Sequence, residues 1–153
     1  MTKLDTVLRQ LRWLPIAVIA VATIQTTIWF AEREPPFHVI EGKVIPPSTP
    51  GGVLRVDGKV YRDLNRDCYV RIMHWIEDSK GFRHFLPTLG LTNESIQRAE
   101  RITPGQTKYV HQIAESVATG QANYHAENAY ICNPTHLVWP IVVVTDIAFE
   151  VTR

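Results

Sequence analysis

Cysteine is the residue type whose chemistry is easiest to define here, because the chain has only two, Cys68 and Cys132. Two cysteines in a domain that faces an oxidising compartment are expected to form a disulfide. Such a bridge would close a loop of about 65 residues and remove roughly 4 kcal/mol of unfolded-state entropy in the chain-entropy model. The alternative is a pair of buried free thiols.

Histidine and serine, the other residues able to do chemistry, form no recognised motif. The histidines include no HExxH motif and no pair four residues apart, and no serine lies in a G-x-S-x-G elbow. We therefore predict no enzymatic activity, no metal and no cofactor, and we expect His74 to be a satisfied core residue. The six histidines are His38, His74, His84, His111, His125 and His136.

The loop Cys132-Asn133-Pro134-Thr135-His136 resembles the copper-ligand loop of cupredoxins, which are also β-sandwich proteins. A blue-copper site needs a second histidine and usually a weak axial methionine soon after the first. The two methionines of this chain, Met1 and Met73, lie far upstream of the loop. We therefore prefer the disulfide to a copper site for Cys132.

An apolar segment near the N-terminus predicts a membrane-spanning helix. Residues 13–30 (WLPIAVIAVATIQTTIWF) contain no charged side chain. At about 1.5 Å per helical residue they reach about 27 Å, close to the roughly 30 Å hydrocarbon thickness of a bilayer. Within this segment Gln25 is a possible contact to a partner helix, because a side-chain amide in lipid has no water to bond and is stabilised by a hydrogen bond to another helix.

The flanking charges predict the orientation of this helix. Lys3, Arg9 and Arg12 precede it, so we expect a cytoplasmic basic tail at 1–12 and an outer region at 31–153. The alternative is a signal peptide, since the triplet Ala20-Val21-Ala22 resembles a processing site. The apolar run continues for eight residues beyond that triplet, which favours a retained signal anchor.

The outer region has the size and charge of one ordinary domain. Its 123 residues include 13 basic and 14 acidic side chains, a net formal charge of −1. A domain of this length buries about two thirds of its unfolded surface. Binding to nucleic acid needs a basic face, so this balance argues against a nucleic-acid partner.

Alternating apolar and polar residues, separated by Pro, Gly and Asn, predict a mainly β domain. The segment 107–117 also fits a helical stripe, but its β-branched and aromatic content favours a strand. A short helix capped by Asn93 or Thr92 is expected at 93–101, within a crossover between sheets. The expected strands are 37–45, 54–63, 68–76, 82–86, 107–117, 122–132 and 141–151.

This pattern resembles an Ig-like antiparallel β-sandwich over residues 37–153. Tyr130, two residues before Cys132, resembles the tyrosine corner of immunoglobulin-like domains. Trp75 departs from the antibody pattern, because it follows Cys68 by seven residues and lies on the opposite face of the same strand. Only the generic sandwich is therefore carried over.

A Pro-containing stalk at 31–36 should hold the sandwich close to the bilayer. On the strand that follows Cys68, the outward-facing Tyr69, Met73 and Trp75 form a possible partner surface. The alternative is that the crossover at 87–104 covers them.

Five short segments together resemble small membrane-anchored proteins of unknown activity encoded by tailed phages of proteobacteria. This resemblance implies a bacterial inner membrane and a periplasmic outer domain. The segments are Trp13-Leu14-Pro15, Arg33-Glu34-Pro35-Pro36-Phe37, Arg66-Asp67-Cys68, Tyr130-x-Cys132-Asn133-Pro134 and Trp139-Pro140-Ile141.

These observations favour a non-enzymatic, single-pass membrane protein whose outer domain binds a protein partner or a second copy of itself. The first alternative is an assembly or lysis accessory that acts through the spanning helix. The second is a periplasmic metal-binding domain of the cupredoxin kind.

Overall fold

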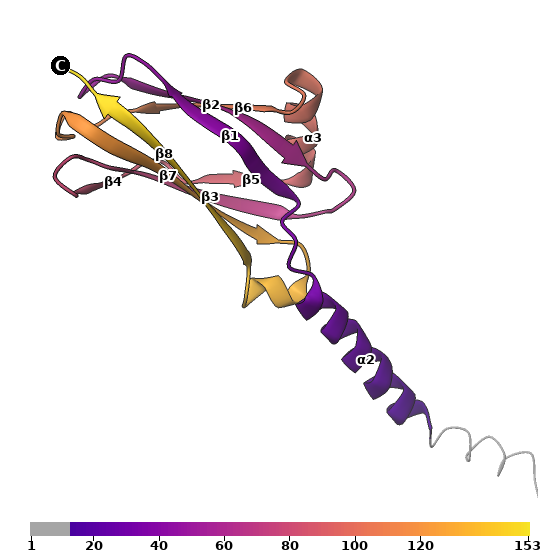
Figure 1. Ribbon diagram of the computed structural model, residues 1–153. Helices are drawn as coiled ribbons and strands as arrows, with labels where there is room; N and C mark the ends of the chain where they lie inside the picture. The colour runs from indigo at the N-terminus through magenta and orange to yellow at the C-terminus, as the bar shows by residue number, and fades with distance from the viewer. Residues whose placement is uncertain (1–12) are drawn as a thin grey trace, which may run out of the picture.

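The computed structural model describes residues 13–153, so the predicted basic tail at 1–12 lies outside the described residues. The apolar segment forms a single helix, α2 (Leu14–Ala31), with Pro15 in its first turn and none of its residues buried. Within the described chain it is the one helix long and apolar enough to cross a membrane, with a mean hydropathy of 1.8. It leaves the folded domain at one end (Figure 1).

Two antiparallel sheets make up the rest of the chain, and the predicted mainly β sandwich is confirmed (Figure 1). One sheet has three strands in the order β1-β2-β6, and the other has five, β4-β3-β7-β8 with β5 also paired to β3. The strands are β1 (Phe37–Ile45), β2 (Val53–Arg62), β3 (Tyr69–Glu77), β4 (Arg83–Phe85), β5 (Leu89–Leu91), β6 (Gln106–Gln112), β7 (Gly120–Ile131) and β8 (Ile141–Val151).

Alternate residues of the strands turn inward and form the core between the sheets, as the period of two requires. On β3 the inward residues Val70, Ile72 and Ile76 are at most 1% exposed, and on β7 Tyr124 and Tyr130 are equally buried. Two hydrophobic clusters fill the space, and the partly buried Tyr109 packs against both.

The crossover between the sheets contains the predicted short helix, α3 (Asn93–Ile102). Thr92 is its N-cap and forms a capping box with Ser95, which satisfies two backbone N–H groups at the helix start. Arg62 of β2, whose side chain is only 6% exposed, forms an ion pair with Glu100 and fixes the other end of α3.

The predicted disulfide between Cys68 and Cys132 is present, with 4.1 Å between the Cα atoms. The two residues flank β3 and β7, which pair directly through Tyr69 and Ile131. The bridge therefore joins neighbouring strands of one sheet, whereas the immunoglobulin disulfide crosses between sheets.

Two local expectations differ from the structure. Tyr130 donates its hydroxyl hydrogen bond to the carbonyl of Phe37, at the start of β1, rather than to backbone a few residues upstream as in a tyrosine corner. The strand expected at 107–117 ends at Gln112, because Ile113 and Val117 fill the core from a loop instead.

Removing the disulfide should destabilise the domain by about 4 kcal/mol, since the bridge constrains a loop of about 65 residues in the unfolded chain. We expect the Cys68→Ala/Cys132→Ala variant to unfold at a lower urea concentration in detergent, as followed by circular dichroism. Reduction of the unmodified protein should give the same shift. An unchanged midpoint in both cases would contradict this account.

Candidate interaction surfaces

The outer face of the five-stranded sheet carries a row of aromatic side chains, Phe85, Trp75 and His125, which we call the aromatic row. Trp75 stacks on His125 with 5.0 Å between ring centroids and 10° between planes. Phe85 lies 6.3 Å from Trp75 on the other side and is 75% exposed. Asp146 of β8 accepts a 2.5 Å hydrogen bond from His125, which fixes the imidazole against the indole. Exposed aromatic anchors held rigidly are typical of binding surfaces.

Of the predicted partner surface, Tyr69 is 45% exposed, while Met73 and Trp75 are half-buried. The segment at 87–104 contributes β5, which extends the sheet beside β3. Tyr69 packs its ring on Gly90 of β5, where a Cβ atom would lie only 2.5 Å from the tyrosine hydroxyl. The crossover segment thus packs against the Tyr69 ring. A role for these three residues in partner binding stays a prediction.

A second cluster lies between the sheets and consists of His74, Tyr109, His111 and Tyr124. The His74 ring is 4.8 Å from that of His111 and 5.2 Å from that of Tyr109, and its Nδ1 atom forms a hydrogen bond with the Tyr124 hydroxyl. Within the described chain, Nε2 of both histidines has no hydrogen-bond partner. His74 is therefore a core residue, but it is only half satisfied.

Burial makes the charged forms of this cluster unfavourable. It lowers the pKa of His74 to about 4, with a smaller effect from His111, and it also lowers the pKa of His111. It raises the pKa of Tyr109 and Tyr124. Both imidazoles are neutral at pH 7, and no group of three metal-ligating side chains occurs among the described residues.

Asp78 is a buried carboxylate that organises the turn between β3 and β4. Burial raises its pKa, but a hydrogen bond from His84 and backbone N–H groups of Ala118, Phe82 and Lys80 outweigh it, so the pKa lies well below its ordinary value. Its oxygens accept hydrogen bonds from Lys80 and Phe82 in the turn, from His84 of β4 and from Ala118, which ties the turn to the loop before β7.

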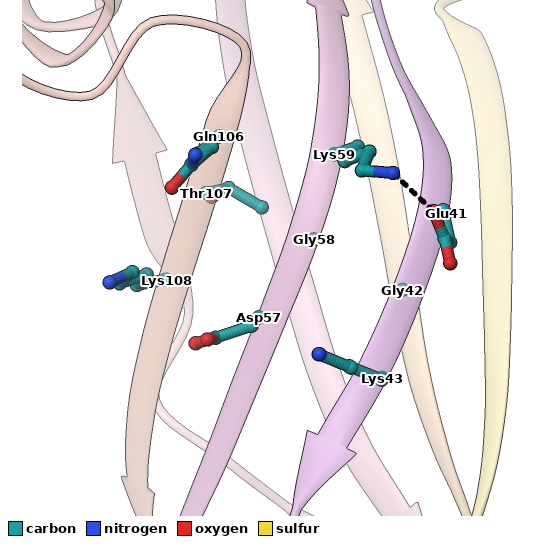
Figure 2. A pocket seen from close by; sticks show the side chains of 9 residues that line it. All are labelled: Glu41, Gly42, Lys43, Asp57, Gly58, Lys59, Gln106, Thr107 and Lys108. Atoms are coloured by element: carbon teal, nitrogen blue, oxygen red, sulfur yellow. Dashed lines mark ion pairs between the residues drawn. The ribbon is translucent and has the colours of Figure 1, made fainter.

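The three-stranded sheet has a shallow hollow on its outer face, over the paired Gly42 and Gly58 (Figure 2). Lysines and carboxylates alternate around it. Lys59 forms a 2.9 Å ion pair with Glu41, and Asp57 lies between Lys43 and Lys108 in the strand register. Opposite charges therefore face each other across the strands, and nothing in the hollow selects an ionic ligand.

The junction between α2 and the sandwich is built from residues about 100 positions apart in the chain. After the disulfide, the 3-10 helix η1 (Pro134–Leu137) lies beside the end of α2 (Figure 1). Asn133 donates to the Glu32 carboxylate at 3.0 Å, and the buried His136 approaches the Glu32 carbonyl at 3.1 Å. Arg33 donates to the carbonyls of Trp139 and Pro140.

These contacts change the meaning of the predicted stalk at 31–36. Arg66 forms a 2.6 Å ion pair with Glu32 and donates to the carbonyl of Glu34 at 2.5 Å. The segment is thus bound to the domain on two sides. Its stiffness comes from these polar contacts as well as from Pro35 and Pro36.

Sequence reasoning missed several of these residues. His125 and Phe85 come from strands other than that of Trp75, so no local spacing joins them. Tyr109 and His111 occupy alternate positions on β6 and face inward. This alternation in the sequence is a usable indication of burial. Cys132 is bonded to Cys68, so its sulfur is not available as the thiolate that a copper loop requires.

The buried histidines should make the folded state sensitive to acid. The unfolded chain binds a proton on His74 near pH 6.5, but the folded chain does so only near pH 4. The free energy of unfolding is therefore unaffected by this group above pH 6.5. It falls by up to about 3 kcal/mol as the pH drops towards 4, because only the unfolded chain binds the proton in this range. Urea unfolding measured across this range should show the loss.

The variant His74→Gln keeps a hydrogen-bond acceptor for Tyr124 but does not titrate, so its stability should depend less steeply on pH. The matched control is His38→Gln, at an exposed position of β1, which should keep the steep dependence. Equal pH dependence in His74→Gln and the unmodified protein would rule out His74 as the source.

No protein-family model matches this chain, and no curated protein matches its sequence. The resemblance to phage-encoded membrane proteins therefore stays a prediction, and functional inference depends on the surfaces described above.

Proposed function

We propose that the protein is a non-enzymatic, single-pass membrane protein that presents its β-sandwich to a protein partner on the outer side of a bacterial inner membrane. The observation that carries the proposal is the attachment of a fully unburied apolar helix to a folded domain. None of the 18 residues of α2 is buried, and only its last turn contacts the rest of the described chain. A bilayer is the environment that such a helix fits.

The junction supports a retained anchor over a cleaved signal peptide. Cleavage after Ala22 would leave residues 23–31 of α2 as the N-terminus of the mature chain, held against the domain by the contacts of Asn133 with Trp29 and of His136 with Glu32. Ile24, Ile28 and Phe30 of that stub are each 48 to 61% exposed. A secreted domain would then carry an apolar stub in water, which is an unfavourable arrangement.

The disulfide supports an oxidising outer compartment, because such bridges persist where thiols are not kept reduced. A periplasmic domain with a cytoplasmic N-terminus satisfies both the disulfide and the basic residues that precede the helix. The phage resemblance, with a host envelope component as partner, is part of this proposal.

The aromatic row is the surface we assign to the partner. It combines an exposed Phe85 with the half-buried Trp75 that His125 and Asp146 hold in place. Rigid aromatic anchors lose little side-chain entropy on binding, which favours a protein partner. A second copy of the chain and a host protein both fit this chemistry.

A second candidate function, an assembly or lysis accessory acting through the helix, is favoured by one observation. A shallow groove on α2 is lined mainly by small side chains, and Thr23, Thr26 and Thr27 each donate to a carbonyl four residues earlier. Small, internally satisfied residues let a second helix approach closely. Replacing residues 14–31 with an unrelated apolar helix should abolish function in this case only.

Retention of the anchor predicts that the purified protein keeps its N-terminal segment. We expect the intact mass of protein from membranes to match the full chain, and we expect the protein to remain with the membranes after alkaline carbonate washing. A mature chain that begins at Thr23 and is recovered in the soluble fraction would overturn the proposal.

Partner binding through the aromatic row predicts site-specific crosslinking. A photoreactive phenylalanine at Phe85 should give a discrete crosslinked species in membranes, because this side chain is exposed beside Trp75. The control is the same probe at Val110, which is 67% exposed on the outer face of the other sheet. Equal products from both positions, or monomer alone from Phe85, would contradict this assignment.

A further inference from the structure

Three consecutive exposed apolar residues lie at the end of the sandwich from which α2 leaves. Leu137 is 70% exposed, Val138 is 92% exposed and Trp139 is 57% exposed. We call these residues the membrane-proximal patch. An apolar tip of this kind is costly in water, so a partner surface is expected to cover it.

The patch is continuous with the apolar surface of α2. The Trp139 ring lies 6.2 Å from that of Phe30 in the last turn of the helix. Figure 1 shows η1 beside that turn, with the remainder of α2 leading away from the domain. Whatever covers Phe30 therefore also reaches Trp139.

Polar contacts fix the patch relative to the helix. Asn133 donates its side-chain amide towards the carbonyl of Trp29 and to the carboxylate of Glu32. Arg33 donates from the other side to the carbonyls of Trp139 and Pro140, at 2.9 and 3.1 Å. The end of α2 and the patch thus form one rigid unit.

The composition of this unit suits the boundary between lipid and water. The Arg33 guanidinium lies 4.4 Å from the centre of the Trp139 ring, which forms a cation–π pair. Tryptophan is enriched at the headgroup level, and arginine extends its charge towards phosphates from the same depth. Because the length of α2 only just matches the hydrocarbon core, its last turn reaches this level.

We infer that the membrane-proximal patch inserts into the outer leaflet, so that the bilayer itself is its occupant. This inference rests on the proposed anchoring of α2. Continuity with Phe30 favours lipid over a protein partner, because a protein on the patch would have to displace lipid from the helix. The sandwich then has two attachments to the membrane, and its orientation relative to the surface is fixed.

The test measures the depth of an environment-sensitive fluorophore attached to single added cysteines in the full-length protein. The variants are Val138→Cys in the patch, Ile24→Cys in the middle of α2, and Phe82→Cys in the turn between β3 and β4. All three positions are highly exposed, at 92, 61 and 65%. The labelled proteins are reconstituted into phosphatidylethanolamine/phosphatidylglycerol vesicles that contain lipids brominated at different depths. Intact mass confirms that the native disulfide is retained.

We expect blue-shifted emission and quenching at position 138 that place the label about 5–10 Å into the headgroup and acyl boundary, as for interfacial helices. Position 24 should be quenched near the bilayer centre, and position 82 should not be quenched. Deep quenching at position 24 with water-like emission at 138 would overturn the insertion of the patch but leave the anchor intact. Water-like emission at position 24 would instead overturn the anchoring of α2, and the inference with it.

Discussion

The antiparallel pairing of β3 with β7 is the constraint on which the rest of the structure depends. It runs from Tyr69 opposite Ile131 to Glu77 opposite Asn123. At one end it brings Cys68 beside Cys132, and the disulfide then locks the register. On the outer face it places Trp75 against His125, and on the inner face it places His74 near Tyr124. A shift by one residue would exchange the inner and outer faces.

The same pairing determines how the helix is attached. β7 ends at Ile131, and the chain passes through Cys132 directly into Asn133 and η1. Because the disulfide holds the start of this loop, Asn133 and His136 are positioned to contact the last turn of α2. The attachment of the helix therefore depends on the folding of the sandwich. A flexible tether would not couple the two in this way.

The interior and the surfaces differ in what they contribute. The buried His74 and His111 are neutral and enclosed between the sheets, so they affect the stability of the domain. The hollow over Gly42 and Gly58 is surrounded by three lysines and two carboxylates, and exposed ion pairs such as Lys59–Glu41 contribute little to the free energy of unfolding. The outer surface is chemically distinctive at the aromatic row and at the membrane-proximal patch. We assign the first to a protein partner and the second to lipid, in keeping with the proposed position of the domain close to a membrane.

The sequence by itself determined the apolar helix, most of the strands and the pairing of the two cysteines, and it narrowed the cap of α3 to Thr92 or Asn93. These features depend on local periodicity, capping chemistry and a simple count, all of which can be read without knowing the fold. The tertiary structure alone decided that the disulfide lies within one sheet, that Tyr130 bonds to Phe37, and that residues 113–119 form a loop. It also decided which side chains gather around Trp75 and around the end of α2. His125 lies far from Trp75 in the chain, and only the register of β3 with β7 brings the two together. Trp139 lies far from Phe30 and Arg33, and only the position of η1 at the end of α2 brings these together, so no local pattern could reveal these contacts.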